Sequence, residues 1–141
     1  METKYSKLIQ LQDKNISAIE NQILEKNHLI ELAKKDIKVI EKEILSAKPP
    51  QFGDFSIMQQ FHKGIWNMNN DIKKIENKIS MLNSEKNLLY KHLKNANIEK
   101  EKFIYLENQI LLKEQERLRK KEQSDLDEVA VMLFNQQKKR L

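Results

Sequence analysis

The chain has 141 residues, a third of which are charged, with 26 basic against 21 acidic side chains and a formal net charge of +5. It contains two glycines, two prolines and no cysteine. This composition excludes a disulfide scaffold and thiolate chemistry, and it is too poor in turn residues for a β-sheet protein. The modest basic excess is compatible with acidic partners but is not diagnostic of nucleic acid.

Isoleucine recurs at every seventh position of the N-terminal part, at Ile9, Ile16, Ile23, Ile30, Ile37 and Ile44. A sustained seven-residue apolar repeat is the mark of a coiled-coil seam. An ideal straight helix drifts relative to such a repeat, so the repeat is kept only where the helix wraps around a partner. The pattern therefore predicts a helix over about residues 4–46 that requires a second helix.

The segment AKPPQFGDFS, residues 47–56, interrupts this pattern with two prolines, a glycine and an aspartate. Lys48 precedes Pro49 and is pushed away from helical dihedral angles, so the first helix ends here. Ser56 and Gln59 have the spacing of a capping box, which predicts that a second helix begins near Ile57.

The second helical pattern runs over about residues 57–138. Its apolar side chains follow steps of four and three at Phe61, Ile65, Met68, Ile72, Ile75, Ile79, Leu82, Leu89, Leu93 and Ala96. A short loop makes two such helices antiparallel neighbours. The predicted fold is all-α, an antiparallel two-helix coiled-coil hairpin forming one elongated unit over residues 1–141. Because the second helix is longer, it continues past about Phe103 as an overhang without a partner.

The overhang carries a basic run, RLRKK, and then an apolar cluster in LDEVAVMLF. The cluster lies along one helical face and consists of Leu126, Val129, Ala130, Leu133 and Phe134. A helical arm with an apolar face and no partner in its own chain must fray, self-associate or bind another molecule. The basic run is either a solvated face or a contact for an acidic protein.

Catalytic and metal chemistry have no support in this sequence. The three histidines, His28, His62 and His92, share no ligand spacing, and no phosphate-binding loop or nucleophile motif occurs. Two paired helices also bury only a thin seam and enclose no pocket. We therefore expect no enzymatic activity, no metal and no cofactor. No apolar run approaches the roughly 20 residues of a membrane span, and the charged N-terminal segment is unlike a signal peptide, so we expect a soluble, cytoplasmic protein.

Three segments together resemble the FliJ family of the flagellar type III export apparatus. They are YSKLIQLQDKNISAIENQI near the N-terminus, QQF after the linker, and KKEQSDLDEVAVM near the C-terminus. The resemblance spans nearly the whole chain. It implies an antiparallel coiled coil, similar to the central stalk of rotary ATPases, that inserts its termini into a hexameric export ATPase and also binds the cytoplasmic domain of the membrane export-gate protein.

The resemblance also implies two sets of binding residues. The ATPase contact falls on the overhang, at Arg117, Arg119, Lys120, Lys121, Leu126, Asp127, Glu128, Val129, Ala130 and Leu133. The gate contact of the family is an aromatic, two apolar residues and a histidine at steps of four, three and four, which map onto Phe61, Ile65, Met68 and Ile72. Isoleucine replaces the histidine at the last position. Trp66 lies off the seam nearby, and an exposed tryptophan is a plausible anchor for the same partner.

The expected protein is thus a non-enzymatic stalk, a monomer when unbound, that is cytoplasmic and associates peripherally with the membrane at the export apparatus. Export chaperones are further partners in the family, although no residue here is assigned to them. The scaffold would serve a flagellar or a virulence secretion system alike. Two alternatives remain: a homo-oligomeric coiled coil in which the overhangs pair, or a basic arm that binds a membrane surface or nucleic acid.

Overall fold

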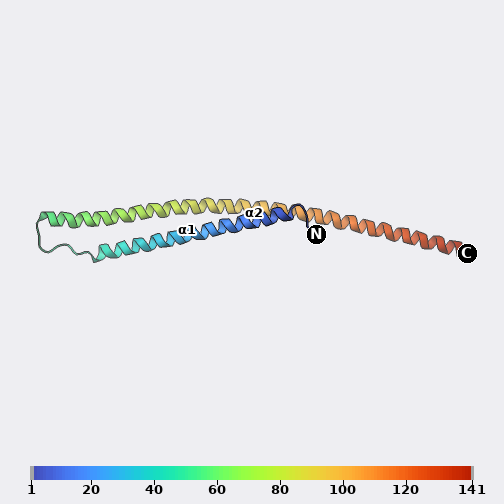
Figure 1. Ribbon diagram of the computed structural model, residues 1–141, viewed down its shortest axis with the longest axis horizontal. Coiled ribbons are helices and arrows are strands. Elements are labelled where there is room, and N and C mark those ends of the chain that lie inside the picture. Colours follow the sequence, from blue (N-terminus) through green and yellow to red (C-terminus); the bar gives the residue numbers. More distant parts are fainter. Residues whose placement is uncertain (1, 141) are drawn as a thin grey trace. The chain divides into compact units, whose positions relative to one another are not determined.

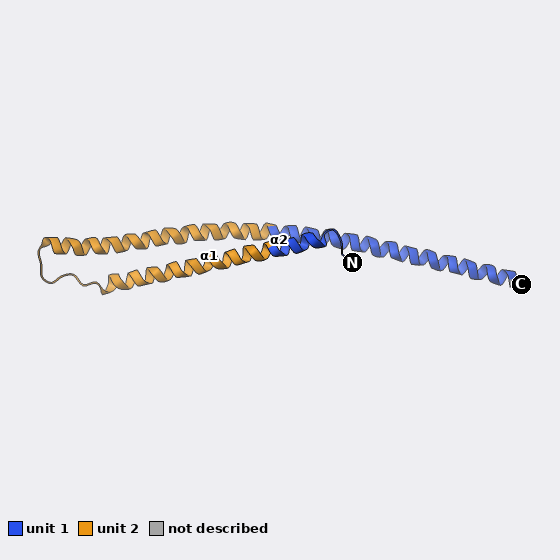
Figure 2. Cartoon of the chain, in the orientation of Figure 1, with its two compact units in different colours: residues 1–14, 96–141 blue, residues 15–95 orange. Residues whose placement is uncertain are grey.

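The computed structural model describes residues 2–140 and the side chains of residues 2–139. It contains two helices, α1 (Ser6–Ser46) and α2 (Phe55–Arg140), and no strand occurs in the described part of the chain (Figure 1). The all-α helical hairpin predicted from the sequence is confirmed. The contacts divide into two units, one of residues 15–95 and one of residues 1–14 with 96–141 (Figure 2).

In the unit of residues 15–95, the buried side chains are those of the isoleucine seam. The heptad isoleucines Ile16, Ile23 and Ile30 are buried, whereas Ile37 and Ile44 are half-buried. The remaining buried side chains of this unit are Ile19, Ala33 and, from α2, Leu82. Burial of these apolar groups is the main force that holds two helices together, because their backbone hydrogen bonds are already satisfied within each helix.

A charged residue occupies the seam between Ile19 and Ala33. Lys26 extends its ammonium group to Glu85 of α2, with Nζ and Oε2 2.8 Å apart. The hydrogen bond to Glu85 raises the pKa of Lys26 above its ordinary value. Farther along the same unit, Val39 and Ile40 line a groove together with Asp71 and Ile75. Residues later in α1 thus meet residues earlier in α2, as an antiparallel pair requires.

In the other unit, residues 3–13 contact the middle of α2 through polar and aromatic groups. The ammonium of Lys100 lies 2.6 Å from an Asp13 carboxylate oxygen. The rings of Tyr5 and Phe103 stack with their centroids 6.1 Å apart. Thr3 and Ser6 both donate hydroxyl hydrogen bonds to Oε2 of Glu107, at 2.8 and 2.7 Å. This end of the pair is therefore held by specific polar contacts in addition to the apolar Ala96, which is buried.

Acid should loosen the contact between the N-terminus and Glu107. The hydrogen bonds from Ser6 and Thr3 lower the pKa of this carboxyl below its ordinary value of 4.5. A carboxyl whose pKa is lowered in the folded state stabilises that state at pH values above its ordinary pKa. This stabilisation is lost as the pH falls through the folded-state pKa. After correction for the pH dependence of the intrinsic exchange rate, we expect amide hydrogen exchange of residues 3–9 to become faster as the pH falls below about 4.5. Glu107→Gln should show fast exchange already at pH 7, and Glu101→Gln, at an exposed position nearby, should not.

The cap of α2 differs from the predicted one. The helix begins at Phe55, and the side chain of Asp54 accepts a hydrogen bond from the backbone N–H of Ile57 at 3.2 Å. The capping box proposed for Ser56 is therefore wrong: Ser56 lies inside the first turn, and the aspartate that precedes the helix does the capping. Gly53 supports this entry with a φ of 137°, and a Cβ there would lie 2.6 Å from Ile57 Cδ1.

Removing the cap should weaken the hairpin. We expect Asp54→Ala to lower the free energy of unfolding by about 1 kcal/mol, because it leaves a backbone N–H of the first turn without its acceptor. Urea unfolding followed by circular dichroism measures this change. Ser56→Ala is the matched control and should have little effect. An equal loss of unfolding free energy for both variants would show that Ser56 also caps the helix.

Candidate interaction surfaces

The C-terminal part of α2 is an exposed helical arm. Every residue from Gln115 to Lys139 is exposed, and Glu114 is the last half-buried position. The cause is the difference in length between the helices: α1 has 41 residues and α2 has 86. The N-terminal residues reach α2 at Glu107, and beyond that point α2 has little to pack against in its own chain. We call residues 115–139 the arm.

The basic run of the arm is partly neutralised within the helix. Arg117 pairs with Glu114, and Arg119 pairs with Glu116, each with a guanidinium nitrogen 2.7 Å from a carboxylate oxygen. These hydrogen bonds raise the pKa of both arginines and lower the pKa of both glutamates. Such exposed pairs add little stability. No ion pair within the described residues engages Lys120 or Lys121, so these two lysines carry the free positive charge of the run.

Apolar side chains surround the end of the arm. The predicted face is exposed, at 64% for Leu126, 51% for Val129 and 57% for Leu133, and Ala130 is also exposed. Exposure continues onto the other sides of the helix at Val131, Met132 and Phe134. The helix is thus apolar all round over residues 129–134, a pattern otherwise found in buried helices. Val131 and Met132 lie outside the face predicted from the sequence, although the unbroken apolar run VAVMLF contained the signal for them.

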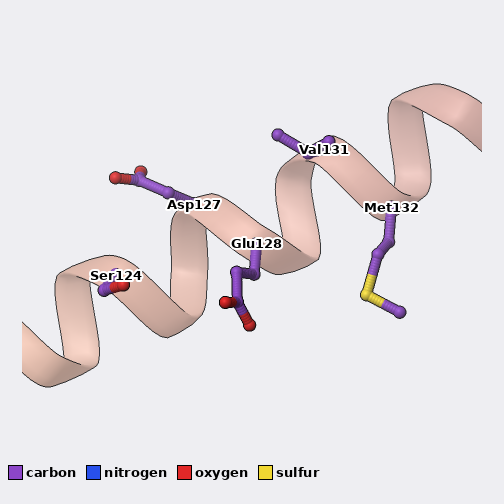
Figure 3. Close-up of a pocket in the computed structure, with 5 residues that line it drawn as sticks. All are labelled: Ser124, Asp127, Glu128, Val131 and Met132. Carbon is purple, nitrogen blue, oxygen red and sulfur yellow. The ribbon is translucent and has the colours of Figure 1, made fainter.

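The opposite side of the arm has a shallow groove that combines acidic and apolar groups. Ser124, Asp127, Glu128, Val131 and Met132 line it, and all five come from α2 alone (Figure 3). Asp127 and Val131 extend to one side of the helix in this view, and Glu128 and Met132 to the other. Because no second element closes the groove, it suits a macromolecular contact better than an enclosed small ligand.

The predicted gate residues have two different environments. Phe61, Ile65, Met68 and Ile72 are half-buried, in keeping with their positions on the seam, and the Phe61 ring lies edge-on to His62. Trp66 is 63% exposed. A partner can therefore reach Trp66 directly, whereas the four seam side chains offer only part of their surface.

Exposed apolar side chains also occur at the linker, where no binding residue was predicted from the sequence. Phe52 is 90% exposed and Phe55 is 77% exposed, and Leu45 at the end of α1 is 85% exposed. The two phenylalanines flank Gly53 and Asp54, whose local conformation is set by the positive φ and the cap. Hydrophobic periodicity could not identify the two phenylalanines, because they lie outside both helical repeats.

The described residues give little support for a metal site or a membrane-spanning helix. No group of three or more histidine, aspartate or glutamate side chains is gathered so as to hold a metal ion within residues 2–140. No helix of the described part is long and apolar enough to span a membrane.

Comparison with known proteins gives one match. A family model described as the flagellar FliJ protein matches residues 1–139, which is nearly the whole chain. No curated protein and no solved structure matches the chain.

Proposed function

The chain belongs to the FliJ family, whose members are non-enzymatic components of the flagellar export apparatus, and from that premise we propose that it is the cytoplasmic stalk of this apparatus. In this role the arm binds the hexameric export ATPase, and the region around the linker and the first turns of α2 binds the cytoplasmic domain of the membrane export-gate protein. The protein would associate with the membrane only through that partner.

The exposed arm is the observation that carries the proposal. A helix that is apolar all round over residues 129–134 is stable in water only when something encloses it. A ring of subunits around the arm would cover every side at once, whereas a flat partner would cover one face. Lys120 and Lys121, which are exposed next to the apolar segment, would favour acidic groups on the ring.

The direct test mixes the protein with the purified export ATPase of the same organism and follows hexamer formation and ATP hydrolysis. We expect the full chain to stimulate both, and a chain ending at residue 112 to stimulate neither while keeping its helical circular dichroism, because the contacts of residues 3–13 with α2 lie before residue 112. Equal stimulation by the two chains would exclude the arm as the ATPase contact.

Trp66 is the best single test of the gate contact. An exposed tryptophan at the centre of an interface often contributes more than 2 kcal/mol, so we expect Trp66→Ala to weaken binding of the gate cytoplasmic domain by at least about tenfold. Isothermal titration calorimetry of each variant with the purified gate cytoplasmic domain measures the dissociation constant. Tyr90→Ala, at a position of α2 that is also exposed, is the control and should bind normally.

A further inference from the structure

The apolar repeat does not by itself fix how α1 and α2 align. In the unit of residues 15–95, the seam positions of both helices recur with each heptad and are apolar, apart from one position in each helix. Moving α2 along α1 by one heptad, about 10 Å, therefore keeps apolar side chains opposite apolar ones. Regular coiled coils share this ambiguity. Something other than the apolar repeat must select the observed register.

The two exceptions are lysines, and the observed register places them at the same level. They are Lys26 in α1 and Lys86 in α2, and both are half-buried. The ammonium of Lys26 lies 2.8 Å from a carboxylate oxygen of Glu85, the neighbour of Lys86. The same three residues, Glu-Lys-Asn, occur at 25–27 and at 85–87. The single polar positions of the two seams thus meet in one layer, and the layers on either side are apolar.

A slip of one heptad would separate the two lysines. In one direction of slip, Lys78 takes the place of Glu85 beside Lys26, so two ammonium groups meet. Lys86 then moves level with Ile19, which is 8% exposed. No acidic residue occurs three or four positions from Lys78 to replace the lost carboxylate. Each lysine would enter an apolar layer without a partner, and an unpaired charge is costly to bury.

The linker does not prevent this slip. With Glu85 level with Lys26, Ser46 lies level with about residue 65, and α2 begins about ten residues beyond that point. The slip moves Phe55 toward Ser46, so residues 47–54 have a shorter distance to span. The chain connection therefore permits the alternative register, and the side chains have to exclude it.

We propose that Lys26, Glu85 and Lys86, which we call the charged layer, set the register of the hairpin. A polar residue at one position of an apolar seam has this effect in coiled coils, where it specifies register at a cost in stability. Charged groups inside a seam often stabilise less than well-packed apolar groups would. Since a slip changes which residues of α2 extend past Ser46, the charged layer keeps the surface near the linker the same in every molecule. It acts whether or not the protein is a stalk.

Distances between two spin labels in the full-length protein test the charged layer. The natural chain has no cysteine, so Leu24→Cys and Asn95→Cys, at exposed positions, carry the labels. We expect one distance with the natural charged layer. Lys26→Leu with Lys86→Leu should add a second distance, longer by up to about 10 Å. The same variant should unfold at a higher urea concentration, because an apolar layer replaces a charged one.

The matched control replaces two lysines outside the seam. Lys35→Leu with Lys73→Leu makes the same change in composition at exposed positions and should keep the single distance. A second distance in this control as well would overturn the proposal, because the register would then respond to net charge and not to the charged layer.

A swap of two dipeptides moves the charged position of α2 by one heptad without changing the composition. It exchanges residues 78–79 with residues 85–86, through Lys78→Glu, Ile79→Lys, Glu85→Lys and Lys86→Ile. The longer distance should then become the main one, because Lys26 meets its carboxylate at position 78. Circular dichroism checks that the variant is folded.

Two results would overturn the proposal. One is a single, unchanged distance in both the leucine variant and the swap, since the register would then be set elsewhere, for instance by Asp13 and Lys100. The other is a lower urea midpoint for the leucine variant together with one distance, since the lysines would then only stabilise the hairpin.

Discussion

Replacing Leu126 and Val129 together by aspartate is expected to abolish binding to the export ATPase while leaving the hairpin folded. The two side chains are 64% and 51% exposed, so the helix tolerates the change. In a complex they would be buried, and each buried apolar side chain of this size contributes about 1.5–3 kcal/mol. Placing carboxylates there adds a desolvation cost, so affinity should fall by more than about a hundredfold.

The measurement is ATPase binding by calorimetry, with circular dichroism of each variant. The control replaces Leu24 and Met81 by aspartate, at positions that are 65% and 66% exposed and lie in the unit of residues 15–95. This control has the same change in charge and a similar loss of apolar surface but should bind normally. Undiminished binding by the Leu126 and Val129 variant would show that the ATPase uses another surface.

The second large effect is expected at the isoleucine seam. Ile23→Ala should lower the free energy of unfolding by about 2–5 kcal/mol, because Ile23 is 6% exposed and the thin seam leaves little other apolar surface to fill the space. Leu24→Ala, at the next residue, should change it by less than about 0.5 kcal/mol, because Leu24 is 65% exposed. Urea unfolding of both variants measures the difference. Similar losses for the two would mean that the seam does not pass through Ile23.

This contrast between neighbours explains how the seam could be found without a structure. The isoleucines repeat at seven residues, and a helix turns such a repeat onto one side whatever the partner is. The prolines of the linker and the apolar spacing of four and three residues in α2 also act on the nearby backbone, whatever the partner is. Backbone geometry alone therefore connects these patterns to two helices that pair, and the exposed arm follows from their unequal lengths.

The residues that sequence reasoning missed depend on contacts between distant parts of the chain or on one local dihedral angle. Nothing near Glu107 in the sequence indicates that Thr3 and Ser6 donate to it, since that contact exists only once the register of the two helices is set. Asp54 caps α2 in place of Ser56 because the positive φ of Gly53 sets where the helix begins. Phe61, Ile65 and Met68 fitted both the seam and a binding site, and their half-buried state shows how much surface the seam leaves free.

Two long helices with an unpartnered C-terminal arm could be predicted from the sequence, because periodicity and chain length act locally along a helix. Which positions of each repeat are buried depends on how the two helices pack. The packed structure also shows which charges are already paired, as at Arg117 and Arg119, and which apolar groups remain exposed, as at Trp66 and Phe52. The reason is that burial and pairing are properties of two surfaces in register, and a single helical pattern describes only one of them.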